Sequence, residues 1–273
     1  MPRNQQDNPY AVIEHAVQKL KAKEYGARED QDRKTMDEVF DRRAMLAIYK
    51  LMTEGLIESI DFPISTGKEA NIFRVTSKED KRFALKIYRT SNATFKRIAR
   101  YIEADPRFHG ITGNRRKVIL AWATKEYRNL LRLQKAKVRV PEPIKFYQNL
   151  LLMEYIGTEQ MPAPMLRNVL LEDPMATYKI ILKYIRLAYQ KAELVHGDLS
   201  EYNILMEEAG PVIIDVGQAL TTEHPNADDY LKRDIENINR YFRSLDVKIK
   251  TTEEVMIQVK KKREVKKAKG GKK

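Results

Sequence analysis

The chain has 273 residues, 33% of them charged, and a formal net charge of +13. It contains no cysteine, which excludes disulfide bonds and thiolate metal sites. The polar start, Met1 to Asp7, does not match a signal-peptide core, and no apolar run approaches the ~20 residues of a membrane helix. We expect a soluble cytoplasmic protein without a membrane partner, built as one two-lobed unit or as two small domains.

Residues 1–55 predict a helical extension that packs against the domain that follows. Thr35 and Glu38 have the spacing of a capping box. Apolar residues then recur at helical spacing until Gly55, which suits the end of a helix. Residues 8–24 predict another helix.

From Leu56 the pattern changes to that of an antiparallel sheet. Three short runs rich in β-branched and aromatic residues, at 56–64, 70–76 and 82–88, are separated by turn residues. A further strand-like run covers 150–155. These runs predict strands that pair through short turns.

Residues 90–117 are dense in Arg and Lys and are interrupted by glycine and proline, which predicts a long mobile loop. Its Ser and Thr residues among basic neighbours suggest that the protein itself is an autophosphorylation substrate. Helical patterns follow at 122–135, 175–193 and 228–245.

The C-terminal end concentrates the positive charge. Residues 260–273 hold eight Lys, one Arg and one Glu, which gives +8, while the other 259 residues carry +5. Two interpretations stay open. The segment is either a solvated, disordered tail or an arm that releases counterions when it binds RNA or another polyanion.

The most informative motif is His-Gly-Asp-Leu-Ser-Glu-Tyr-Asn at 196–203, followed by an apolar run that ends at Asp215. An Asp and an Asn five positions apart and a second Asp after a strand are typical of kinase-like sites. In such sites Asp198 orients and deprotonates a hydroxyl, and Asn203 and Asp215 hold magnesium on ATP phosphates. His196 has no second histidine at metal-ligand spacing, which favours a structural hydrogen bond.

Two further patterns suit nucleotide phosphates. Lys86 lies inside an apolar strand, where an ammonium group needs an anion, and Glu126 is its candidate partner, although Glu126 alone also fits an exposed helix carboxylate. The turn between the first two strands has small residues whose amides can approach phosphate oxygens. Taken alone, the pattern favours a simple hairpin turn, and it does not match a Walker loop. The residues of this turn are Ser65, Thr66, Gly67, Lys68 and Glu69.

The strand that ends near Tyr155 predicts a connection between two lobes. Backbone groups of Glu154 and Ile156 are placed there to hydrogen-bond adenine without any required side chain. The same pattern fits an ordinary strand end.

Together these residues resemble the RIO family of atypical serine protein kinases, in its first, archaeal-type (Rio-one) branch. The likeness covers residues 40–245. It rests on the turn at 65–70, the strand that carries Lys86, the motif at 196–203 and Ile-Asp-Val-Gly-Gln at 214–218.

The resemblance implies a two-lobed, protein-kinase-like α+β fold with ATP between the lobes. An antiparallel-sheet lobe is expected at 56–156 and a mainly helical, truncated lobe at 157–249, followed by a basic helix or tail at 250–273. Lys86 and Glu126 would position the phosphates.

The resemblance also assigns chemistry and partners. Asp198 would accept a proton, and Asn203 and Asp215 would bind Mg²⁺ or Mn²⁺. Family members can phosphorylate the metal-binding Asp, which makes Asp215 a candidate nucleophile. They act in maturation of the small ribosomal subunit, so a pre-small-subunit particle with its rRNA and ribosomal proteins is the expected partner, with residues 260–273 as the candidate RNA contact.

The chain departs from ordinary protein kinases at two places. Gly197 replaces the arginine that normally precedes the catalytic Asp and pairs with a phosphorylated activation loop. No Ala-Pro-Glu follows Asp215, and 58 residues remain after it. We therefore expect neither control by activation-loop phosphorylation nor a large peptide-binding lobe. A small-molecule phosphotransferase of the aminoglycoside or choline type and an ATP-gated, non-catalytic assembly factor remain alternatives.

Overall fold

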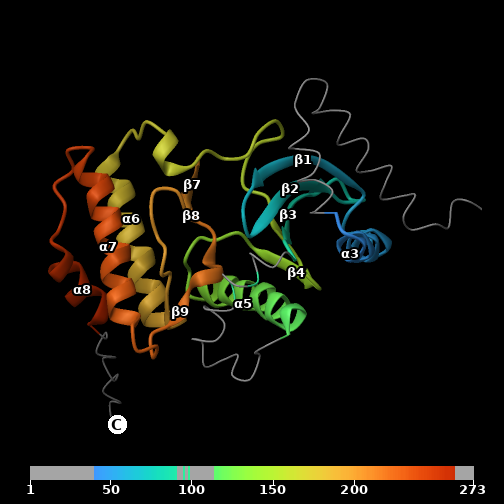
Figure 1. Cartoon of the computed structure of the whole chain (residues 1–273). Coiled ribbons are helices and arrows are strands. Elements are labelled where there is room, and N and C mark those ends of the chain that lie inside the picture. Colours follow the sequence, from blue (N-terminus) through green and yellow to red (C-terminus); the bar gives the residue numbers. More distant parts are fainter. Residues whose placement is uncertain (1–39, 91–94, 96–97, 99–113, 262–273) are drawn as a thin grey trace, which may run out of the picture.

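A five-stranded antiparallel sheet forms the first lobe (Figure 1), with the spatial order β1-β2-β3-β5-β4. The computed structural model describes residues 40–90, 95, 98 and 114–261. The strands are β1 (Ser59–Thr66), β2 (Ala70–Thr76), β3 (Arg82–Tyr88), β4 (Pro143–Tyr147) and β5 (Leu150–Glu154).

Side chains of the sheet alternate between two apolar clusters, as the two-residue period of a strand requires. On β3, Leu85 and Ile87 pack in the cluster that includes α3 (Arg42–Thr53). Ala84 and Tyr88 pack in the cluster that includes α5 (Arg115–Lys135). Lys86 shares the face of Ala84 and Tyr88, so the central strand directs its ammonium group toward α5 and the second lobe.

Helix α3 begins at Arg42, because Asp41 has an extended backbone and its carboxylate accepts hydrogen bonds from the N–H groups of Arg43 and Ala44. The predicted capping residue Thr35 and the predicted helix at 8–24 lie outside the described residues. The prediction of one unbroken helix up to the glycine stop is wrong, because Phe40 and Asp41 are not helical.

The first strand also begins later than predicted. Leu56 and Ile57 do not belong to it, because their backbone N–H groups bond to Leu51 O at 3.0 and 3.4 Å and close the end of α3. Gly55 there has a φ of +76°, which favours glycine.

Helix α5 begins seven residues before the predicted Trp122, inside the predicted loop 90–117. Asn114 caps it by accepting from the Lys117 N–H at 3.2 Å. The helix begins with three basic residues, Arg115 to Lys117, which continue the charged composition of the preceding segment and hide its start. Phe95 and Ile98 are also helical, and Ile98 is fully buried, so the prediction of a wholly irregular mobile loop is wrong at these positions.

Three helices dominate the second lobe, at the end of the molecule away from β1 and α3 (Figure 1). The helix predicted at 175–193 is α6 (Pro174–Leu187) and a π-helical turn, Ala188–Ala192. The other two are α7 (Ala227–Arg243) and α8 (Thr252–Lys260). Helix α8 buries Val255 and Val259 against the other two, so it belongs to this lobe.

Two short antiparallel strand pairs carry the loops of the site. β6 (Leu194–Val195) pairs with β9 (Leu220–Thr221), and β7 (Ile204–Glu207) pairs with β8 (Gly210–Ile213). The motif at 196–203 therefore lies between β6 and β7, and Asp215 lies directly after β8. None of the described helices combines the length and apolar character needed to cross a membrane.

Candidate active site

Lys86 and Glu126 form a buried ion pair between β3 and α5. Lys86 Nζ lies 2.8 and 2.9 Å from the two carboxylate oxygens of Glu126. The side chains are only 9% and 2% exposed. A buried ammonium and a buried carboxylate each need a partner of opposite charge, and here each supplies the other.

Asp215 brings the second lobe to the same ammonium group. Its Oδ1 lies 3.0 Å from Lys86 Nζ, and its side chain is 49% exposed toward solvent. Its backbone is left-handed, with φ 57° and ψ 55°, where the chain turns out of β8. The charge of Lys86 lowers the pKa of Asp215 against the effect of burial, so the carboxylate is ionised at neutral pH. Burial opposes the charge on Lys86, but Asp215 and Glu126 together raise its pKa.

The motif at 196–203 forms a loop that places Asp198 and Asn203 next to Asp215. The side-chain amide of Asn203 donates to the Asp198 carbonyl at 2.7 Å, which leaves its amide oxygen to point elsewhere. The Ile214 N–H donates to the Asn203 carbonyl at 3.0 Å and ties the two loops together. Partial burial raises the pKa of Asp198, and the charge of Asp215 adds to the rise, which makes Asp198 a stronger proton acceptor than a free aspartate.

His196 is a structural residue of this loop. Its Nε2 lies 3.0 Å from the Ile214 carbonyl oxygen and therefore carries the proton, and its Nδ1 accepts from the Asp198 N–H at 3.3 Å. Gly197, the next residue, has a φ of +82°, and a Cβ there would lie 3.2 Å from Leu220 Cδ2. The position thus favours glycine, which explains why no arginine precedes Asp198.

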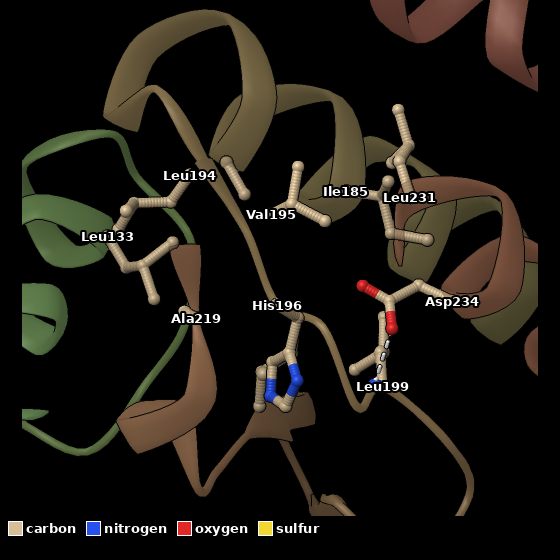
Figure 2. Close-up of a pocket in the computed structure, with 11 residues that line it drawn as sticks. Leu133, Ile185, Leu194, Val195, His196, Leu199, Ala219, Leu231 and Asp234 are labelled. Carbon is tan, nitrogen blue, oxygen red and sulfur yellow. Dashed lines mark hydrogen bonds between the residues drawn. The ribbon is translucent and has the colours of Figure 1, made fainter. Parts of the chain in front are cut away.

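Asp234, which the sequence did not single out, supports this loop from α7. Figure 2 shows its carboxylate directed at the loop that carries His196 and Leu199, with a dashed line to Leu199. Its two oxygens accept from the backbone N–H groups of Gly197 and Leu199, each at 2.8 Å. Asn237 donates to the Leu199 carbonyl at 3.1 Å. The signal was an acidic residue on the apolar stripe of an amphipathic helix, whose members are Leu231, Ile235 and Ile238.

The predicted phosphate-binding turn is an exposed hairpin between β1 and β2. The Gly67 N–H donates to the Ala70 carbonyl at 2.9 Å. Because Ala70 pairs with Tyr88, the turn stands beside the end of β3 that carries Lys86. Ser65, Thr66 and Lys68 are exposed, and Glu69 is half-buried.

The connection between the lobes is anchored by the side chain of Glu154. The carboxylate of Glu154 receives the Arg139 guanidinium at 2.6 and 2.8 Å. Arg139 also bonds to Glu207 of β7 at 2.9 Å, so it links this connection to the second lobe. The Glu154 N–H donates to the Glu142 carbonyl at 2.8 Å. The Ile156 N–H makes no hydrogen bond to any described residue, and it remains suitable for adenine.

The donor atoms around Asp215 suit magnesium bound together with phosphates. Mg²⁺ prefers oxygen ligands and is commonly held by one or two protein groups plus substrate phosphates. The Asp215 carboxylate and the Asn203 amide oxygen are such groups, from adjacent loops. When bound there, the ion would neutralise charge that develops on the phosphates.

The two-lobed fold, the strand lysine paired with a helix glutamate and the two loop carboxylates define a protein-kinase-like protein. The family model of the RIO domain matches residues 71–255. The chain belongs to the RIO family of serine/threonine protein kinases, in the RIO1 subfamily.

Curated relatives carry this family's name. A human serine/threonine-protein kinase RIO1 is 40% identical over 252 residues, covering 90% of this chain and 44% of its own length. A RIO-type serine/threonine-protein kinase Rio1 from Haloferax volcanii is 44% identical over 210 residues, covering 77% of this chain and 72% of its own. The chain thus spans less than half of the human relative.

A solved structure shares the fold. The crystal structure of the Rio2 kinase-ADP/Mg²⁺-phosphoaspartate complex from Chaetomium thermophilum matches with a TM-score of 0.61 and 28% identity. The match covers 78% of this chain and 65% of that one. The expected two-lobed kinase fold is therefore confirmed.

Proposed function

We propose that this protein is a Mg²⁺- and ATP-dependent serine/threonine kinase or ATPase that forms an aspartyl phosphate on Asp215. The observation that carries the proposal is the position of Lys86 between Glu126 and Asp215, 2.8 and 3.0 Å from a carboxylate oxygen of each. A cation at this place can bind the phosphates of ATP.

The nucleophilic step is supported by the ionised, half-exposed carboxylate of Asp215. A carboxylate oxygen of Asp215 would attack the γ-phosphorus, the bond to the β-phosphate oxygen would break, and ADP would leave with that electron pair. The phosphoryl group of this acyl phosphate would then pass to water or to a serine hydroxyl, whose proton Asp198 would accept, and the bond to Asp215 would break to release its carboxylate. The Rio2 complex named above contains ADP, Mg²⁺ and a phosphoaspartate, which agrees with this course.

Replacement of Asp215 tests the proposal. Asp215→Ala should abolish both ATP hydrolysis and autophosphorylation, whereas Asp229→Ala, at an exposed position of α7, should retain both. Wild-type protein quenched during turnover with γ-labelled ATP should carry label that hydroxylamine releases, as an acyl phosphate does. If Asp215→Ala hydrolysed ATP and phosphorylated itself at wild-type rates, the proposed role of Asp215 would be refuted.

We also propose a pre-small-ribosomal-subunit particle as the partner, with the basic C-terminal segment in contact with its rRNA. The charge of residues 260–273 supports this. Lys260 belongs to α8, and the Lys261 carbonyl accepts from Gln190 at 2.8 Å, so a clean truncation should end after Lys261. The truncated protein should bind rRNA with a shallower salt dependence than the full chain. Equal slopes would assign this segment to solvation alone.

A further inference from the structure

The donor capacity of Lys86 is fully used inside the protein. An ammonium group has three N–H donors. Two of them meet Oε1 and Oε2 of Glu126, at 2.8 and 2.9 Å, and the third meets Asp215 Oδ1 at 3.0 Å. A phosphate oxygen gains a hydrogen bond from Lys86 only when one of these three contacts is given up.

The Tyr88 hydroxyl is a second hydrogen-bond donor to one of these oxygens, so Lys86 can leave that oxygen without leaving it unpaired. It donates to Glu126 Oε2, the same oxygen that Lys86 contacts at 2.9 Å. Tyr88 is 1% exposed, and its backbone is held in both directions by Asn149, through two hydrogen bonds of 2.9 Å. Burial and the charge of Glu126 raise the pKa of Tyr88 well above its usual value, so the hydroxyl stays a donor.

Glu126 itself is held in place by the segment that follows Asp215. Gly217 packs so closely that a Cβ there would lie 3.1 Å from Glu126 Oε2 and 3.1 Å from Trp122 Cζ2. One turn further along α5, the Asn129 amide donates to the Val216 carbonyl at 2.8 Å. The carboxylate therefore cannot move aside to find another partner when Lys86 shifts.

We propose that Tyr88 is a positioning residue that lets Lys86 exchange Glu126 Oε2 for a phosphate oxygen of ATP. The inference rests on the proposed ATP-binding function. A buried carboxylate oxygen that loses its donor is expensive, because it has already lost its water. With the Tyr88 hydroxyl on Oε2, Lys86 can leave that oxygen while it still has a hydrogen bond.

The test compares ATP with adenosine, which lacks phosphates, in Tyr88→Phe. The variant should bind ATP·Mg²⁺ about ten- to a hundredfold more weakly, the cost of a hydrogen bond to a charged group, and should bind adenosine like the wild type. The matched control is Tyr127→Phe, whose ring contacts Phe146 on the other side of α5 and should keep both affinities. Isothermal titration measures both ligands.

A double-mutant cycle with Lys86→Ala adds a second condition, because Tyr88 acts only through Lys86. Tyr88→Phe should change ATP affinity by less than twofold when Lys86 is already alanine. Unchanged ATP affinity in the single variant, an equal loss for ATP and adenosine, or a full additional loss in the Lys86→Ala background would each overturn the inference. Wild-type protein that binds adenosine but gains nothing from phosphates would instead refute the proposed function.

Discussion

Asp234 Oδ2 lies 2.8 Å from the backbone nitrogen of Gly197, and Asp234 Oδ1 lies 2.8 Å from that of Leu199. The carboxylate thus holds the residues on either side of Asp198 by their main chain, from a helix of the core. The position of Asp198 depends on a side chain that lies 37 residues from Gly197 in the sequence.

Asp234→Asn should lower kcat by about a hundredfold. The NH₂ group of the asparagine would face the N–H of Gly197 or Leu199, and two donors cannot bond to each other, so the loop and Asp198 would be displaced. The melting temperature should change little, since the variant removes a buried charge and this offsets the loss of a hydrogen bond. Asp246→Asn is the control, at an exposed, left-handed position that asparagine tolerates. Equal activity of the two variants would contradict this role.

The buried charge of Asp234 should also appear in the pH dependence of stability. Burial raises its pKa to about 6, against the two backbone hydrogen bonds, whereas the unfolded chain has a value of about 3.9. The folded state therefore binds this proton more tightly. This group should lower the free energy of unfolding, by at most about 3 kcal/mol, as pH rises from about 4 to about 6.

The measurement is denaturant unfolding of wild type and Asp234→Asn between pH 4 and 7.5. The free energy of unfolding of the wild type minus that of Asp234→Asn should fall as pH rises from about 4 to about 6 and level off above about pH 6. If this difference rises with pH instead, the two backbone hydrogen bonds to Asp234 outweigh the effect of its burial.

Arg139→Lys should raise KM for ATP about three- to tenfold with little change in kcat. A lysine is a point charge and cannot bond to both oxygens of Glu154 while also reaching Glu207. The connection between the lobes would lose its anchor next to the adenine site. Arg132→Lys, whose partner Glu193 is exposed, is the control and should leave KM unchanged. Steady-state kinetics at varied ATP measure both.

Gly217→Ala should reduce activity about tenfold and destabilise the fold by about 1–3 kcal/mol, as overpacking does. The added Cβ would meet Glu126 Oε2 and Trp122 Cζ2, both at 3.1 Å, and push α5 away from Asp215. Trp122→Phe makes room on one of these two sides. If the clash is the cause, the double variant should recover part of the lost stability in thermal unfolding.

The spacing of Asp198, Asn203 and Asp215 predicted from the sequence alone that these residues lie together on two adjacent loops, as phosphotransfer chemistry needs. The strands at 70–76 and 82–88 were predicted to the residue, since side-chain alternation is a local property. The pairing of Lys86 with Glu126 was also predicted, because a lysine inside an apolar strand requires a buried anion.

Local sequence patterns did not predict features that depend on contacts between distant residues or on a single capping residue. The first three residues of α5, Arg115 to Lys117, are basic, so only the Asn114 cap marks where the helix begins. Glu154 is a strand end, as its local pattern predicts, but that pattern gives no sign of its ion pair with Arg139.

The sequence by itself therefore determined the kind of chemistry, through residue types at short, fixed spacings. Tertiary structure alone decided which groups hold that chemistry in place. Tyr88 meets Glu126 across 38 residues and Asp234 meets Gly197 across 37. Such partners leave no periodic trace in the chain, because a hydrogen bond depends on where two atoms lie after folding and not on how far apart their residues stand in the sequence.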